Sequence, residues 1–174
     1  MTTPYLRNAW YVAAWSNEVE RKLFERTLLG ESILLYRKES GEVAALGNAC
    51  PHRKAPLSMG KLVGDAVQCG YHGLRFDGSG ACVLNPHGDG MIPPRMKTPS
   101  YPAEERHGLV WLWFGDAAKA DASTIPDFSC HQDPELAFVG GVIEILRRTG
   151  AIDAALHRSV SRLGHKPWIL ILGC

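Results

Sequence analysis

The chain has 174 residues, of which 45% are hydrophobic and 21% are charged, a composition typical of one globular domain with or without an appendage. Its formal net charge of +1 argues against the basic surface that nucleic-acid binding requires. No apolar run approaches the roughly 20 residues of a membrane-spanning helix. We therefore expect a protein that binds neither nucleic acid nor membrane.

The N-terminal segment does not resemble a secretory signal peptide. Arg7 and Asn8 interrupt the apolar stretch of residues 1–15, whereas a signal peptide has a continuous apolar region. We therefore expect a cytoplasmic location. In that reducing compartment the five cysteines should be metal ligands or free thiols rather than disulfides.

Short strands separated by turn residues dominate the first two thirds of the chain. The turn sequences Glu39-Ser40-Gly41 and 77–80 (Asp-Gly-Ser-Gly) predict two hairpins, and the proline-rich segment 85–102 predicts a loop. Six strands are predicted, at residues 32–36, 42–46, 66–68, 74–76, 81–84 and 108–114. This pattern indicates a mainly β protein with antiparallel strands, arranged as a small sandwich or barrel.

The composition changes near residue 145. Residues 145–174 contain five basic residues and one acidic residue, whereas residues 1–144 contain 14 basic and 17 acidic residues. Residues 153–163 have the apolar spacing of a short helix, and residues 168–172 form an apolar segment with no predicted partner. We expect a domain at 1–143 and a short irregular or helical basic tail at 144–174.

Two short segments carry the residues with the clearest chemistry. Cys50-Pro51-His52 is followed, after sixteen residues, by Cys69-Gly70-Tyr71-His72, and both segments lie in predicted turns between strands. Two Cys and two His form the ligand set of a Rieske [2Fe–2S] centre, in which two His replace two Cys on one iron. We therefore predict that Cys50, His52, Cys69 and His72 bind such a cluster.

A structural zinc site uses the same residue types. Its usual spacing, however, pairs Cys with Cys and His with His, whereas each segment here contains one of each. A zinc module and a chance placement of these residues are therefore the weaker interpretations.

The sequence around these ligands resembles the Rieske domain of ring-hydroxylating and O-demethylating non-haem iron oxygenases. Segments 50–60 and 67–77 carry this resemblance. Segments 8–14 (Asn-Ala-Trp-Tyr-Val-Ala-Ala) and 85–87 (Asn-Pro-His) are similar to the vanillate-demethylase-like members, and the resemblance extends from about residue 5 to about residue 143.

The resemblance implies an antiparallel Rieske domain with a cluster-binding subdomain and cluster loops at 50–60 and 69–77. It implies that Cys50 and Cys69 bind one iron and that His52 and His72 bind the other. It also implies one-electron transfer from a ferredoxin or flavin reductase to a mononuclear Fe(II) that activates O₂. The resemblance implies a homotrimer, which is the oligomeric state of the family. A monomer is the alternative for this chain.

The second loop also differs from that of respiratory-chain Rieske proteins. Those proteins have a disulfide-forming Cys, a Ser and a Tyr where this chain has Tyr71, Leu74 and Phe76. Fewer hydrogen bonds to the cluster sulfurs imply a low reduction potential, which suits a centre reduced by a ferredoxin or flavin reductase.

The facial triad of the mononuclear iron, two His and one carboxylate, has no counterpart in this sequence. After residue 143 the histidines are His157 and His165, which lack the His-x₄-His spacing of the family. We therefore expect an oxidoreductase component that is not catalytically complete alone, and we favour a truncated or frameshifted gene with a non-family tail. A stand-alone Rieske ferredoxin is the alternative.

The remaining candidates are weaker. Cys82 is expected in the core, and Cys130 and Cys174 as free thiols. Arg53 and Lys54 are either part of a docking surface for an electron donor or merely solvated. His87 and His107 are minor candidates for a functional role, and Trp111 and Trp113 are expected in the core.

Overall fold

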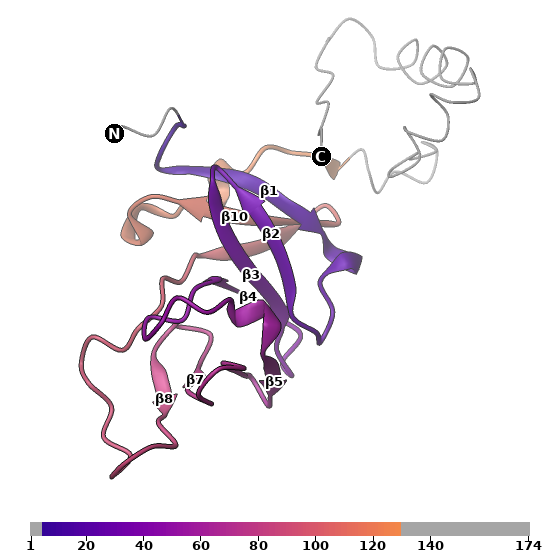
Figure 1. Cartoon of the computed structure of the whole chain (residues 1–174). Coiled ribbons are helices and arrows are strands. Elements are labelled where there is room, and N and C mark those ends of the chain that lie inside the picture. Colours follow the sequence, from indigo (N-terminus) through magenta and orange to yellow (C-terminus); the bar gives the residue numbers. More distant parts are fainter. Residues whose placement is uncertain (1–4, 130–174) are drawn as a thin grey trace, which may run out of the picture. The chain divides into compact units, whose positions relative to one another are not determined.

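The computed structural model describes residues 5–129, which form three antiparallel sheets and four short 3₁₀ helices (Figure 1). The first sheet has the order β1 (Ala9–Trp15), β10 (Leu109–Phe114), β9 (Ala103–Arg106). The second has the order β2 (Phe24–Leu28), β3 (Glu31–Arg37), β4 (Val43–Gly47). The third has the order β5 (Lys61–Val63), β6 (Ala66–Gln68), β7 (Arg75–Phe76), β8 (Cys82–Leu84). The 3₁₀ helices are η1 (Ser16–Glu18), η2 (Leu57–Met59), η3 (Ala117–Lys119) and η4 (Ala122–Thr124).

The mainly β, antiparallel fold expected from the sequence is confirmed. All six predicted strands are present as β3, β4, β6, β7, β8 and β10, with ends that differ by one residue at most. Segment 85–102 contains no named strand, as expected for a loop. The basic tail at 144–174, its expected helix, and Cys130, Cys174, His157 and His165 all lie outside the described residues.

Four strands were not predicted, and all of them lie at the edge of a sheet. They are β1, β2, β5 and β9. An edge strand is paired on one side only and is often partly exposed, so that polar residues are tolerated along it. In β2 the sequence Phe-Glu-Arg-Thr-Leu alternates between half-buried and exposed positions, and in β9 the sequence Ala-Glu-Glu-Arg is mostly exposed.

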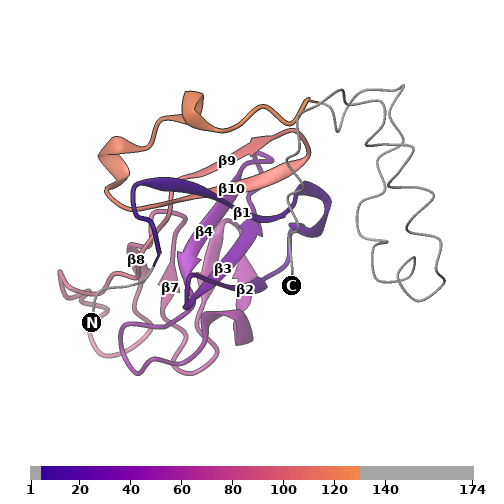
Figure 2. The ribbon, with the colours of Figure 1, turned by 90° about the horizontal axis from the view of Figure 1, so that it is seen from above.

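In the second sheet β4 and the middle of β3 are buried on both faces, because each face packs against a separate hydrophobic core. Ile33 and Leu35 of β3 contribute to the core shared with the first sheet, whereas Leu34 and Tyr36 contribute to the core under the third sheet. Successive side chains of a strand point to opposite faces, so the part of β3 that lies between the two cores, residues 33–36, is hydrophobic at each successive position. Figure 2 shows the first sheet crossing over β3 and β4.

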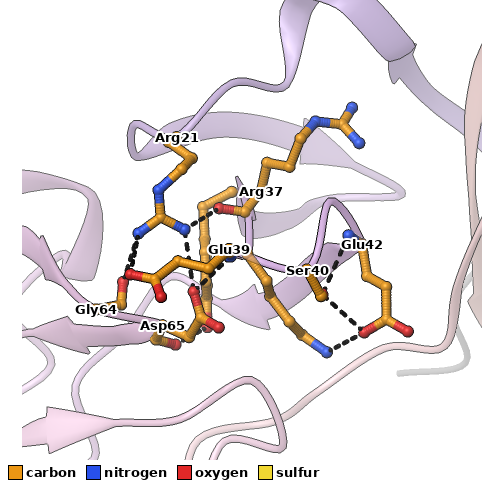
Figure 3. Close-up of polar contacts among 9 residues, drawn as sticks. Arg21, Arg37, Glu39, Ser40, Glu42, Gly64 and Asp65 are labelled. Atoms are coloured by element: carbon orange, nitrogen blue, oxygen red, sulfur yellow. Dashed lines mark hydrogen bonds and ion pairs between the residues drawn. The ribbon is translucent and has the colours of Figure 1, made fainter.

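Polar contacts also join the second sheet to the third (Figure 3). The carboxylate of Asp65, in the β5–β6 turn, accepts hydrogen bonds from Arg21 (3.0 Å) and from the backbone N–H of Glu39 (2.8 Å). Arg21 also donates to the carbonyl of Gly64 (3.1 Å), and the Tyr36 hydroxyl donates to the carbonyl of Asp65 (2.9 Å). These contacts hold the β5–β6 turn against the β3–β4 hairpin.

The two loops that contain the Cys/His pairs approach each other at two glycines. A Cβ atom at Gly60 would overlap the carbonyl oxygen of Gln68, and one at Gly70 would lie 3.0 Å from the carbonyl oxygen of Met59. Glycine is therefore required for the two backbones to come this close. Among the described residues, no helix is long and apolar enough to cross a bilayer.

We predict that Gly60→Ala lowers the free energy of unfolding by about 2–3 kcal/mol, because the added methyl group must displace a backbone carbonyl. Urea denaturation followed by circular dichroism measures this loss. Gly64→Ala is the matched control, since Gly64 has φ +57° and no atom within 4 Å of the added Cβ. It should cost only the backbone strain of about 1 kcal/mol. Equal losses in the two variants would contradict the prediction.

Candidate iron–sulfur site

The two loops with the Cys/His pairs share one backbone geometry. In the first loop, the N–H of Cys50 donates to the carbonyl of Ala55 (2.9 Å), and the N–H of Lys54 donates back to the carbonyl of Cys50 (2.8 Å). In the second loop the same two bonds join Cys69 to Leu74 (2.8 Å) and Gly73 to Cys69 (3.1 Å). Lys54 and Gly73 are each the fourth residue after the cysteine, and both are left-handed, with φ +59° and +74°. Each loop is therefore a closed turn that presents one cysteine and one histidine.

The side chains of the four predicted ligands form an inner pair and an outer pair. Cys50 and Cys69 are each 2% exposed and belong to the hydrophobic core under the third sheet. His52 is exposed and His72 is half-buried, and their ring centroids are 4.8 Å apart. The two loops thus place the two cysteines in one core cluster and the two imidazoles beside each other on the outer side.

The pKa of the buried Cys50 thiol is raised and the pKa of the His72 imidazole is lowered, so that both shifts favour the neutral form. Burial raises the pKa of the Cys50 thiol, and the neighbouring Cys69 raises it further, so Cys50 favours the neutral thiol until a cation is present to stabilise the thiolate. Partial burial lowers the pKa of His72, and the nearby His52, His87 and Arg53 lower it further. A neutral imidazole is the form that binds a metal.

Buried polar side chains anchor the chain next to the first loop. Asn48 is 5% exposed, and its amide group donates to the hydroxyls of Ser32 (3.1 Å) and Ser58 (3.0 Å) and accepts from the backbone N–H of Ser58 (2.7 Å). Thr98, 1% exposed, donates to the carbonyl of Gly47 (2.9 Å). A buried network of this kind rigidifies its surroundings when each member has a partner.

Aromatic side chains surround the outer face of the second loop. The ring centroids of Tyr71 and His72 are 3.8 Å apart, with an interplanar angle of 31°. Tyr71 itself is 64% exposed. The ring of His87 lies 6.0 Å from that of His72. The imidazole of His72 is therefore packed between neighbours that restrict its orientation.

This donor set fits a [2Fe–2S] cluster better than a single metal ion. Thiolates and imidazoles bind iron in such clusters, and here they form two pairs, as two irons require. A structural zinc site usually pairs Cys with Cys and His with His along the sequence, whereas each loop here contains one of each.

The other candidates from the sequence lie elsewhere or play another part. Cys82 is a half-buried free thiol that packs against the core, as expected. Trp111 and Trp113 are buried, which confirms their expected place in the core. His107 faces Asp127 at 3.5 Å. The sequence reasoning missed Asn48, because nothing local to Asn48 indicates its burial. It noted Tyr71 only as the residue in place of a respiratory-chain Cys and did not predict its contact with His72.

Comparisons with known proteins agree with this geometry. The family model described as "Rieske [2Fe-2S] domain" matches residues 9–102. Dicamba O-demethylase, oxygenase component, from Stenotrophomonas maltophilia is 53% identical over 137 residues, which are 79% of this chain and 40% of that protein. The vanillate O-demethylase oxygenase subunit of a Pseudomonas species is 40% identical over 139 residues, 80% of this chain and 39% of that protein.

A solved structure supports the same relationship. The crystal structure of dicamba monooxygenase with non-haem iron and dicamba superimposes with a TM-score of 0.72 at 53% identity, covering 76% of this chain and 40% of that one. The chain thus spans about 40% of the length of the curated relatives it matches. Because the family model covers more than half of the chain, this protein belongs to the Rieske [2Fe–2S] domain family, and its cofactor is a [2Fe–2S] cluster.

Proposed function

We propose that Cys50, His52, Cys69 and His72 hold the cluster and that the domain carries single electrons in an aromatic O-demethylating or ring-hydroxylating oxygenase system. The observation that supports this most is the pairing of two buried cysteines with two outward histidines on matched loops. The similarity to oxygenase components favours an oxygenase system over the alternative, a stand-alone Rieske ferredoxin.

The two pairs of ligands have different tasks in this proposal. When bound, the cluster supplies a site that accepts and releases one electron. Cys50 and Cys69 fix its inner side and, being buried, exclude water from it. His52 and His72 provide the outer side, and because they reach the surface we assign the entry and exit of electrons to these imidazoles.

We assign the electron donor to a ferredoxin or flavin reductase and the acceptor to a mononuclear non-haem iron. Arg53 and Lys54 are exposed and directly follow His52, so an acidic donor surface would be attracted to the histidine side. The proposed compartment is the cytoplasm, where reducing conditions keep Cys50 and Cys69 as the free thiols that bind iron.

The first prediction concerns the cluster itself. Protein purified without oxygen should contain two irons and two sulfides per chain, and dithionite should produce the electron paramagnetic resonance spectrum of a mixed Cys/His cluster. Cys69→Ala and His72→Ala should abolish that spectrum, because each removes one of the four ligands. Cys82→Ala, the matched control, should retain it, since Cys82 packs against the core and its thiol donates to the carbonyl of Leu84 rather than binding iron. Zinc in place of iron would refute the assignment.

The second prediction concerns the reduction potential. We expect a midpoint in the lower part of the Rieske range, roughly −150 to 0 mV, because buried Leu74 and Phe76 provide no hydroxyl donors to the cluster sulfurs. Protein-film voltammetry measures this value. Phe76→Tyr adds a hydroxyl to the same ring and should raise the potential. A wild-type midpoint near the upper end of the range, about +300 mV, would contradict the explanation.

The third prediction concerns the donor. With an acidic [2Fe–2S] ferredoxin as the probe, Arg53→Gln combined with Lys54→Asn should slow reduction in stopped-flow experiments and flatten its salt dependence, because steering by opposite charges raises association rates. Asn is chosen at residue 54 because it tolerates the left-handed backbone there. Lys119→Gln, an exposed control after β10, should change neither rate nor salt dependence. An unchanged rate in the double variant would place the donor elsewhere.

A further inference from the structure

A third histidine, His87, holds the backbone of the second cluster loop from outside. Its Nε2 atom lies 2.7 Å from the carbonyl oxygen of His72. A carbonyl oxygen can only accept a hydrogen bond, so Nε2 of His87 must carry the hydrogen. This contact therefore assigns the Nε2–H form to His87, with Nε2–H as donor and the His72 carbonyl as acceptor.

This hydrogen bond is one of two that hold the peptide group between His72 and Gly73. The carbonyl of His72 and the N–H of Gly73 belong to the same planar group. That N–H donates to the carbonyl of Cys69 at 3.1 Å, and the carbonyl accepts from His87 on the other side. With both polar atoms held, the peptide plane that follows His72 cannot rotate without breaking a hydrogen bond.

Hydrogen bonds and a packing contact hold the segment that carries His87 in place. The side chain of Asn85 accepts from the N–H of His87 (3.2 Å) and donates to the carbonyl of Met91 (2.7 Å), and the N–H of Gly90 donates to the carbonyl of His87 (3.0 Å). Pro86 lies against the second loop, because a Cβ atom at Gly73 would be 3.2 Å from its Cγ. His87 is exposed, so burial does not explain its placement.

We propose that His87 is a positioning residue for the cluster, which acts by fixing the backbone of His72 and thereby the direction of its imidazole. The inference rests on the proposed function, in which His72 is a ligand. The first loop is anchored by buried Asn48 and Thr98, whereas the second is held by this surface contact. Loss of the contact would let His72 sample several orientations and weaken its hold on iron.

The test compares variants that differ in the reach of one N–H donor. In His87→Gln the terminal amide can occupy the position of Nε2, in His87→Asn the amide is too short, and in His87→Leu the donor is absent. His107→Asn is the control, because His107 faces Asp127 rather than the cluster loops and its left-handed backbone suits Asn. All proteins are full-length, loaded with the cluster, and kept at one pH above 8.

Two readouts are measured, together with the thermal midpoint as a check of folding. The rate of iron transfer to a chelator should rise about fivefold in His87→Leu and His87→Asn, the factor that corresponds to one neutral hydrogen bond. The electron paramagnetic resonance lines of the reduced cluster should broaden in the same two variants, because His72 then adopts several orientations. His87→Gln and His107→Asn should match the wild type in both readouts.

Three outcomes would overturn the inference. The first is wild-type behaviour of both His87→Leu and His87→Asn, and the second is a His87→Gln variant as impaired as His87→Leu. Because His87→Asn keeps a polar side chain, it serves as the test if His87→Leu melts at a lower temperature. The third is absence of the mixed Cys/His signal from the wild type itself, which would refute the proposed function and this inference with it.

Discussion

The burial of β3 and β4 on both faces is the constraint on which the rest of this domain depends. Alternate residues of β3 belong to two different cores, with Ile33 and Leu35 on one side and Leu34 and Tyr36 on the other. β3 and β4 therefore lie between the core shared with the first sheet and the core under the third sheet, which contains the two cysteines. Any shift of β3 by one residue would exchange the two sets of side chains and disturb both cores together.

The position of the cluster loops depends on β3, because their cysteines belong to the hydrophobic core on one face of this strand. Cys50 and Cys69 pack in the same cluster of buried residues as Leu34 and Tyr36. The histidines of the same loops point away from that core and reach the surface. Because the thiols lie inward and the imidazoles outward, the proposed cluster site has a buried inner side and an outer side that is accessible for electron transfer.

The two loops have equivalent backbones but different supports. The first is secured by buried polar groups, Asn48 and Thr98, inside the fold. The second is secured at the surface, where His87 donates to the carbonyl of His72 and Tyr71 covers the imidazole.

The sequence alone determined the fold class, six of the ten strands that the structure describes and the identity of the four candidate ligands. These features are local: turn residues, apolar runs and the Cys/His spacing lie within a few positions of one another. It did not reveal the edge strands β1, β2, β5 and β9. In β2 and β9 charged residues weaken the apolar pattern, whereas the apolar β1 is recognised as a strand only through its pairing with β10, about 100 residues further along the chain. Tertiary structure alone decided that Asn48 is buried and that His87 contacts His72. Those contacts join residues 10 and more positions apart, and the free energy that forms them comes from packing of the whole domain rather than from any short segment.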